Sequence, residues 1–229
     1  MKVLVTGAAG FVGDALCRHL ASAGHIVGGT FRTIPENRDW MQVHATGDLM
    51  GMENFSPFLD GVDAVVHLAA RVHIMRETEA DSDAIYLKAN AELTERLALA
   101  ATEAGVSRFV LLSSIKANGE STADDTTHTE TDAPAPENAY GRSKLAAEEK
   151  LTAVADKSAM TSVSLRIPLV YGPGVGANFA SLLNICDKPL PLPLGGATRN
   201  RRSLLYIGNL TAAIETVLAA HRVASGTYL

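Results

Sequence analysis

The chain has 229 residues, 47% of them hydrophobic, and carries a formal net charge of -5 at pH 7. This length and composition are sufficient for a buried core of domain size. The acidic balance, without any basic stripe, argues against a nucleic-acid or membrane-surface partner, and no apolar run reaches the ~18–20 residues of a membrane span. The two distant cysteines and seven scattered histidines form no CxxC or HExxH pattern, so we expect buried free thiols and no metal site.

Short apolar runs alternate with longer amphipathic stretches over most of the chain. The apolar runs predict strands at residues 2–6, 25–31, 41–49, 62–70, 108–114 and 162–170. The amphipathic stretches predict helices at residues 11–23, 83–104 and 140–157, and Gly24 and Gly105 are expected to end the first two. Apolar strands that do not alternate and are separated by helices indicate a parallel sheet covered on both faces. The predicted class is therefore α/β with a Rossmann-type doubly wound sheet, which binds ligands beyond the carboxyl ends of its strands.

The composition divides the chain into two expected regions. Residues 1–171 are expected to form the dinucleotide-binding Rossmann domain, with an acidic, Thr- and Pro-rich loop at 119–137. Residues 172–229, rich in Gly, Pro and Asn at first, are expected to hold part of a small substrate-binding region mixed with the last Rossmann elements. The chain stops at SGTYL, the pattern of a beginning strand, so we expect this region to be truncated. Met1 leads straight into the first strand without a leader pattern, which predicts a cytoplasmic protein.

The first strand runs into a glycine-rich turn, TGAAGFVG, that opens the first helix. Gly7 permits a tight turn, Gly10 lets the backbone approach a pyrophosphate, and Gly13 lets the helix pack on the strand. Free N–H groups at the helix N-terminus then face the anion. The spacing is G-x-x-G-x-x-G, which differs from the G-x-G-x-x-G fingerprint in its first glycine, but the strand–turn–helix context agrees. We expect a dinucleotide site at Gly7, Gly10, Phe11, Val12 and Gly13.

The second strand ends in Thr30-Phe31-Arg32, without the acidic residue that recognises the ribose of NAD. An arginine can pair with a 2′-phosphate, so Arg32 favours NADP over NAD as the cofactor. A solvated surface charge is the alternative for Arg32. Asp48 and Leu49 follow the third strand and are expected at the adenine edge, although an exposed turn explains Asp48 nearly as well.

Tyr140 precedes Lys144 by four residues in the helix expected at 140–157. At that spacing the two side chains share one helix face, with Cβ atoms roughly 5–6 Å apart. A lysine ammonium held there favours the phenolate, so we expect a lowered Tyr140 pKa and an acid/base role near neutral pH. A tyrosine beside a lysine is common on protein surfaces, so the pair alone does not show whether these residues are catalytic.

The glycine turn is followed in order by HLAA at 67–70, LLSS at 111–114 and YGRSK at 140–144. With these motifs the chain resembles the extended short-chain dehydrogenase/reductases, and within them the NAD-dependent epimerase/dehydratase family that acts on nucleotide sugars. The segments SSIKANGE, PLPLG and NRRSLLYIGNL resemble those of a UDP-glucose 4-epimerase-like branch, which includes reductases of UDP-4-keto sugars. The resemblance covers nearly the whole chain and implies a UDP-sugar substrate.

The resemblance also implies roles for individual residues. Ser114, five residues before Gly119, matches the catalytic Ser or Thr, and Tyr140 and Lys144 match the catalytic Tyr and Lys. Lys144 is then expected to bind the nicotinamide ribose and depress the Tyr140 pKa. Tyr140 exchanges a proton with the sugar oxygen, Ser114 hydrogen-bonds the same oxygen, and hydride moves between that carbon and the nicotinamide.

Other positions are carried over in the same way. The expected cofactor contacts outside the turn are Leu68, Ala69, Ala70, Asn90, Pro168 and Val170, beside Tyr140 and Lys144. A helix-surface amide explains Asn90 equally well. Asn178 and Arg202 are expected to contact the sugar nucleotide with Ser114. Asn209 and Ser203 occupy positions where the family commonly has acidic residues. This difference weakens the assignment of substrate contacts by comparison with typical epimerases.

Three interpretations of the function stay open on the sequence. A 4-epimerase oxidises carbon 4 and returns the hydride to the other face, whereas a 4-keto reductase uses NADPH once. Ile115 and Lys116 follow Ser114, so the Asp-Glu pair of sugar dehydratases is absent. A non-catalytic dinucleotide-binding sensor is the alternative from another class.

The resemblance also suggests a homodimer formed through the helices at 83–104 and 140–157, although burial on the sheet explains the same apolar stripes.

Overall fold

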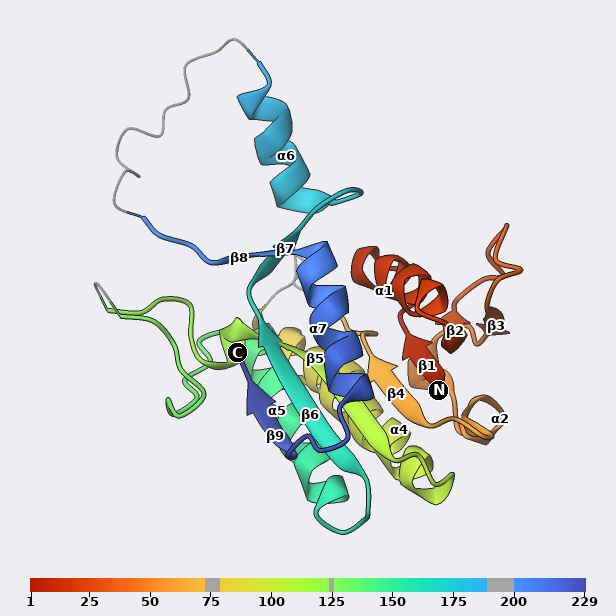
Figure 1. Cartoon of the computed structure of the whole chain (residues 1–229). Helices are drawn as coiled ribbons and strands as arrows, with labels where there is room; N and C mark the ends of the chain where they lie inside the picture. The colour runs from red at the N-terminus through yellow and green to blue at the C-terminus, as the bar shows by residue number, and fades with distance from the viewer. Residues whose placement is uncertain (73–78, 124–125, 189–199) are drawn as a thin grey trace.

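The computed structural model of the chain describes residues 1–72, 79–123, 126–188 and 200–229. Its centre is a seven-stranded sheet in the order β3-β2-β1-β4-β5-β6-β9, with every neighbouring pair parallel (Figure 1). The strands are β1 (Lys2–Thr6), β2 (Ile26–Phe31), β3 (Gln42–Ala45), β4 (Ala64–His67), β5 (Arg108–Ser114), β6 (Thr161–Ile167) and β9 (Gly226–Tyr228). The helices around it are α1 (Phe11–Ser22), α2 (Ser56–Leu59), α3 (Glu79–Tyr86), α4 (Leu93–Glu103), α5 (Ala139–Ala155) and α7 (Ile207–Ala219). The expected Rossmann-type doubly wound sheet is confirmed, with its order reversing between β1 and β4.

Helices bury both faces of this sheet. Along β1, Val3 and Val5 belong to the core beneath α1 and α7, while Leu4 belongs to the core beneath α2, α4 and α5. All three side chains are 1% exposed or less. Because successive side chains of a strand point to opposite faces, a strand covered twice must be apolar at every position. This is why the apolar runs of the sequence do not alternate.

The helix expected at 83–104 differs from the one found. The helical run is α3 followed by a π-helical turn, η2 (Leu87–Glu92), and then α4. A π turn contains one residue more than an α turn, and it persists where side-chain contacts require it. Here the buried Asn90 lies in that turn. The expected stops are confirmed, since Gly24 and Gly105 follow the ends of α1 and α4 with φ of 85° and 77°.

The C-terminal part of the chain is shared between the sheet and a separate excursion. Strands β7 (Leu169–Tyr171) and β8 (Leu204–Tyr206) form a two-stranded parallel sheet, and α6 (Ala177–Cys186) extends away from the main body (Figure 1). By contrast, α7 packs against α1, and β9 pairs with β6. The strand expected at the C-terminus is therefore present. The division at residues 171 and 172 stays a prediction.

Neither cysteine of the chain is in a disulfide. Cys17 is buried as expected, and burial raises the pKa of its thiol to about 12. The expectation of a second buried thiol was wrong, because Cys186 ends the projecting helix α6 and is exposed. In the described part of the chain, no His, Cys, Asp and Glu side chains gather as a metal site, and no helix has the length and apolarity to cross a bilayer.

The turn between β1 and α1 leaves no room for a side chain at Gly13. A Cβ added there would lie 2.2 Å from the Gly7 carbonyl oxygen and 2.8 Å from the Ala8 Cα. An alanine in a helix normally stabilises it by about 1 kcal/mol relative to glycine. We expect the opposite sign for Gly13→Ala, a loss of about 1–3 kcal/mol of unfolding free energy in urea titrations, because backbone must move.

The matched control is Gly51→Ala, at a position where an added Cβ meets nothing within 4 Å. We expect its unfolding free energy to stay within about 0.5 kcal/mol of wild type. Equal effects of the two substitutions would contradict the close approach of α1 to β1.

Candidate active site

The glycine turn lies at the carboxyl end of β1, next to the start of α1. Gly7 has a φ of 72°, and a Cβ there would lie 2.9 Å from the Ala69 backbone nitrogen. Gly10 is the N-cap of α1, and no side chain caps that end. The N–H groups of the first turn, from Phe11 on, are therefore available to an anion, and the helix dipole favours negative charge there. This geometry fits the pyrophosphate of a dinucleotide.

Two polar residues that the sequence analysis missed join β1 to β4 at this end of the sheet. The Thr6 hydroxyl lies 2.7 Å from the His67 Nδ1, and the Ala69 N–H donates to the same hydroxyl over 3.2 Å. His67 is 1% exposed, and burial together with the nearby charge of Lys144 lowers its pKa to about 3. A neutral His67 thus fixes the backbone of the HLAA segment, which includes the expected contacts at Leu68 and Ala70.

Asn90 holds two elements together from the π turn η2. Its Oδ1 accepts the Arg71 N–H over 2.8 Å, and its Nδ2 donates to the Arg71 carbonyl over 3.1 Å. Nδ2 also donates to the Ser143 hydroxyl over 2.9 Å. Asn90 is 1% exposed, so these partners are needed to satisfy its amide. The side chain therefore fixes the segment after β4 against α5, between Tyr140 and Lys144, and a direct cofactor contact of Asn90 stays a prediction.

The structure brings the three predicted catalytic residues together. Ser114 ends β5, Tyr140 lies in the first turn of α5, and Lys144 follows one turn later. The Ser114 hydroxyl lies close enough to the Tyr140 phenol to lower its pKa, and the Lys116 N–H donates to the Ser114 hydroxyl over 3.3 Å. Lys144 is 3% exposed, and its charge acts on the pKa of His67 beneath the site.

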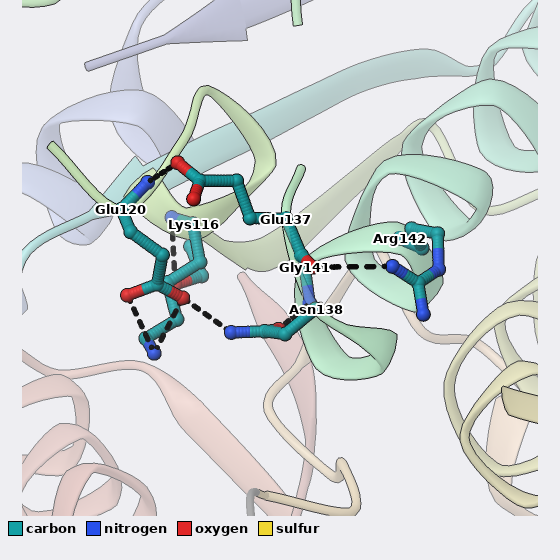
Figure 2. A network of polar contacts seen from close by, with 7 residues as sticks. Lys116, Glu120, Glu137, Asn138, Gly141 and Arg142 are labelled. Carbon is teal, nitrogen blue, oxygen red and sulfur yellow. Dashed lines mark hydrogen bonds and ion pairs between the residues drawn. The ribbon is translucent and has the colours of Figure 1, made fainter. Parts of the chain in front are cut away.

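Ser114 and Tyr140 meet because α5 begins directly against the loop that follows β5. A Cβ on Gly141 would lie 2.5 Å from the Lys116 carbonyl oxygen, so only glycine permits this approach. Asn138 caps α5 by accepting the Gly141 N–H over 2.8 Å, and its Nδ2 donates to the Glu120 carboxylate (Figure 2). The same carboxylate pairs with the Lys116 ammonium at 2.9 Å (Figure 2). This polar network ties the segment after Ser114 to the start of the Tyr140 helix.

The electrostatics of Tyr140 differ from the expectation. Removal of its phenol from water raises the Tyr140 pKa, the hydrogen bond with Ser114 opposes that rise, and the neighbouring Tyr86 adds to it. The rings of Tyr86 and Tyr140 meet edge to face with centroids 6.3 Å apart. Lys144 is not among the groups that lower the phenol pKa, so the expected depression was wrong for the protein alone. Burial dominates because desolvation penalises the charged form of any group.

Lys144 is itself strongly perturbed by its surroundings. Burial lowers the pKa of its ammonium from 10.5 to about 8, and the Glu148 carboxylate one turn later opposes that shift. A buried lysine with a depressed pKa beside a tyrosine and a serine is unusual for a purely structural helix. The arrangement places a phenol, a hydroxyl and an ammonium together, which are groups that can exchange protons.

Two arginines follow β2 in different settings. Phe31 fills the position of the expected acid and is 3% exposed, while Arg32 is exposed and has no polar partner among the described residues. Arg38, which the sequence analysis missed, stacks 5.9 Å from the Phe31 ring and pairs with Asp14 of α1. A solvated Arg32 remains free to bind an anion.

Asp48 and Leu49 take local structural roles in the described chain. The Asp48 carboxylate caps η1 (Leu49–Gly51) by accepting the Met50 N–H over 3.1 Å, which is the turn role considered for it. Leu49 is 9% exposed and belongs to the core. Their contact with an adenine stays a prediction.

The remaining predicted residues lie beyond β6. Pro168 links β6 to β7, and Val170 lies in β7, where it packs on the core beneath α1 and α7. Arg202 is exposed and lies before β8. The Asn178 side chain lies outside the described residues. The structure therefore assembles the glycine turn and the Ser114, Tyr140 and Lys144 group at one edge of the sheet, and the roles of Asn178 and Arg202 stay predictions.

A glycine turn at the switch point of a doubly wound parallel sheet is the arrangement of a Rossmann-type dinucleotide-binding protein, and Ser114, Tyr140 and Lys144 lie at the same edge of the sheet. The chain matches the NAD dependent epimerase/dehydratase family over residues 3–228, and it belongs to that family. It is 40% identical over 229 residues to a UDP-glucose 4-epimerase of Vibrio cholerae, covering 100% of this chain and 70% of that protein.

Two further comparisons extend this result. A 2-alkyl-3-oxoalkanoate reductase of Stenotrophomonas maltophilia is 32% identical over 234 residues, covering 99% of this chain and 67% of that protein. The solved structure of MoeE5 in complex with UDP-glucuronic acid and NAD matches with a TM-score of 0.81 and 30% identity, covering 99% of this chain and 75% of that one.

Burying the Lys144 charge reduces stability at neutral pH. The folded pKa of about 8 lies below the ordinary 10.5, so the unfolded chain binds more protons between these values, and stability rises as pH rises from 8 to 10.5. We expect Lys144→Met to raise the unfolding free energy at pH 7 by up to about 3 kcal/mol. The gain should shrink as pH increases above 8.

Urea unfolding at pH 7 and at pH 9.5 measures both effects. Lys157→Met, at an exposed lysine after α5, is the control and should change stability by less than about 0.5 kcal/mol at either pH. A Lys144→Met variant less stable than wild type at pH 7 would contradict the destabilising burial of this ammonium.

Proposed function

We propose that the chain uses a nicotinamide dinucleotide to oxidise or reduce carbon 4 of a UDP-linked sugar, as a 4-epimerase or a 4-keto reductase. The observation that carries the proposal is the meeting of the Ser114 hydroxyl, the Tyr140 phenol and the buried Lys144 ammonium at the carboxyl end of the sheet. The V. cholerae relative and the MoeE5 complex, which contains UDP-glucuronic acid and NAD, support this substrate and cofactor class.

We assign the cofactor to the edge of the sheet beyond the carboxyl ends of β1, β2 and β4. Its pyrophosphate would lie on the turn formed by Gly7, Gly10, Phe11, Val12 and Gly13, where the helix end lacks a side-chain cap. The adenosine end would lie toward the exit of β2, and the nicotinamide end would lie beside the acid/base centre. Once bound, the group supplies hydride transfer and, in its oxidised form, a positive ring charge near the phenol.

Ser114, Tyr140 and Lys144 then divide the proton chemistry. Tyr140 takes the proton of the sugar hydroxyl when carbon 4 is oxidised and returns a proton to the carbonyl oxygen when it is reduced. Ser114 hydrogen-bonds the same oxygen, and Lys144 holds the ribose and contributes a positive charge. Because burial keeps the Tyr140 phenol protonated, the unaided side chain is better prepared to act as an acid than as a base.

Two observations favour the reductase over the epimerase within this proposal. The first is the protonated phenol, which suits donation to a ketone. The second is the exchange of the ribose-binding acid for Phe31 with the exposed Arg32 beside it, which suits the 2′-phosphate of NADP. The similarity to the V. cholerae epimerase favours the other mechanism. The substrate contacts at Asn178 and Arg202, the two-region division and a homodimer through α4 and α5 belong to the same proposal.

Replacing Tyr140 by phenylalanine separates an enzyme from a dinucleotide sensor. We expect Tyr140→Phe to lower turnover of UDP-glucose, UDP-galactose or a UDP-4-keto sugar by about 10²–10⁴-fold, because it removes the proton donor. Affinity for the reduced cofactor, measured by fluorescence titration, should change little. Tyr228→Phe is the control, since that hydroxyl only donates to the Ala224 carbonyl at the sheet edge. A wild-type chain that binds the cofactor and turns over none of these sugars would favour the sensor.

Arg32 is expected to set the choice between NADPH and NADH. We expect at least a tenfold preference for NADPH, equivalent to about 1.4 kcal/mol, that is lost in Arg32→Ala. Separate fluorescence titrations with NADPH and NADH measure this preference. The control is Arg222→Ala, at an exposed arginine distant in sequence, which should leave the cofactor preference unchanged. Tight NADH binding without a preference in the wild type would refute the role of Arg32 and favour a 4-epimerase.

A further inference from the structure

A buried ion pair lies directly behind the Ser114–Tyr140–Lys144 group. Arg166 and Glu148 each have side chains that are 5% exposed. The guanidinium donates from Nε to both Glu148 oxygens over 3.1 Å and from Nη2 to one of them over 2.7 Å. Its Nη1 donates to the Asn118 Oδ1 over 3.0 Å, and the Ser113 hydroxyl donates to the Glu148 carboxylate. Four side chains from distant parts of the sequence thus form one closed polar cluster.

Every member of this cluster is close in sequence to a residue of the proposed site. Ser113 immediately precedes Ser114, and Asn118 follows η3 (Ile115–Ala117) in the segment after it. Glu148 is one helical turn beyond Lys144. Arg166, in β6, is two residues before Pro168. The cluster therefore fixes the end of β5, the segment that follows it, helix α5 and strand β6 relative to one another.

Stability alone does not explain such a pair. Taking two charges out of water offsets most of their attraction, and well-packed apolar residues of similar volume often stabilise a protein as much or more. Removing one partner only is strongly unfavourable, because it leaves the other charge buried. A buried pair at this position is better explained by the side chains and segments that it holds in place than by a gain in stability.

The pair also controls the charge next to Lys144. Lys144 faces Glu148 and the uncharged Tyr140 on its own helix, His67 on β4, and Arg166 on β6 beyond the carboxylate. His67 stays neutral because its pKa is about 3, and Glu148 raises the pKa of Lys144 against the effect of burial. Loss of the Glu148 charge would therefore move deprotonation of Lys144 to lower pH.

We propose that Glu148 and Arg166 are positioning residues, which hold Ser114, Tyr140 and Lys144 in register and keep Lys144 charged. The inference rests on the proposed function, since it assigns the pair to that site. Neither residue needs to touch the substrate or the cofactor. The pair acts through Ser113 and Asn118 on the Ser114 segment and through α5 on Lys144.

The decisive variant replaces both partners, Glu148→Met with Arg166→Met. The matched control removes the partly exposed pair of Lys150 and Glu95, between α5 and α4, by Lys150→Met with Glu95→Met. Three quantities are measured on the 229-residue chain: the urea midpoint, the pH at which NADH and NADPH affinity falls by half, and turnover of a UDP-sugar. We expect a urea midpoint near that of wild type, an affinity midpoint at lower pH, and turnover reduced roughly 10- to 100-fold by misplacement. The control variant should have the wild-type urea midpoint, pH midpoint and turnover.

A folded double variant with wild-type turnover and a wild-type pH midpoint would overturn the proposal, because the pair would then be structural only. If the double variant fails to fold, Ser113→Ala tests the same idea with both charges in place. It should lower turnover without moving the pH midpoint, and unchanged turnover would overturn the positioning role. If the wild type turns over no UDP-sugar, the proposed function fails while the pH dependence of cofactor binding still tests the pair.

Discussion

The parallel direction of the seven central strands is the constraint on which the rest of this structure depends. Parallel strands bring all their carboxyl ends to one edge, and covering helices must return the chain each time. The glycine turn after β1, His67 at the end of β4 and Ser114 at the end of β5 are therefore neighbours although they are far apart in sequence. The chemistry of the site is assembled by the direction of the chain more than by any single contact.

Close backbone approach is the second condition for the site. Two glycines allow it, Gly13 where α1 meets the turn after β1, and Gly141 where α5 meets the segment after Ser114. In both places a helix N-terminus lies against the backbone of another segment. A side chain at the glycine would push that backbone away. One contact leaves N–H groups open for an anion, and the other brings a phenol to a hydroxyl. Small residues thus determine where the open helix N-terminus and the phenol can lie.

Much of this arrangement could be predicted from the sequence, because its signals are local. The strand–glycine–helix pattern, the helix stops and the four-residue spacing of Tyr140 and Lys144 all depend on residues near each other in the chain. The π turn around Asn90 and the Glu148–Arg166 pair could not, since they depend on side chains that cross between elements. The four-residue step from Lys144 to Glu148 was the available hint. The direction of the Tyr140 pKa was mispredicted because removal of the phenol from water raises its pKa, and Lys144 is not among the groups that lower it.

The π turn η2 has a consequence for how this helical run tolerates change. Its extra residue turns everything before it by about 100° relative to a regular helix. That rotation directs Tyr86, the last residue of α3, toward the Tyr140 ring, while α4 keeps its own apolar face on the sheet. Deleting one residue between 87 and 92 would yield a more regular helix with better backbone bonding, yet it would move Tyr86 away from its edge-to-face contact with the Tyr140 ring. A regular helix and the covering of the Tyr140 ring are therefore incompatible in this segment.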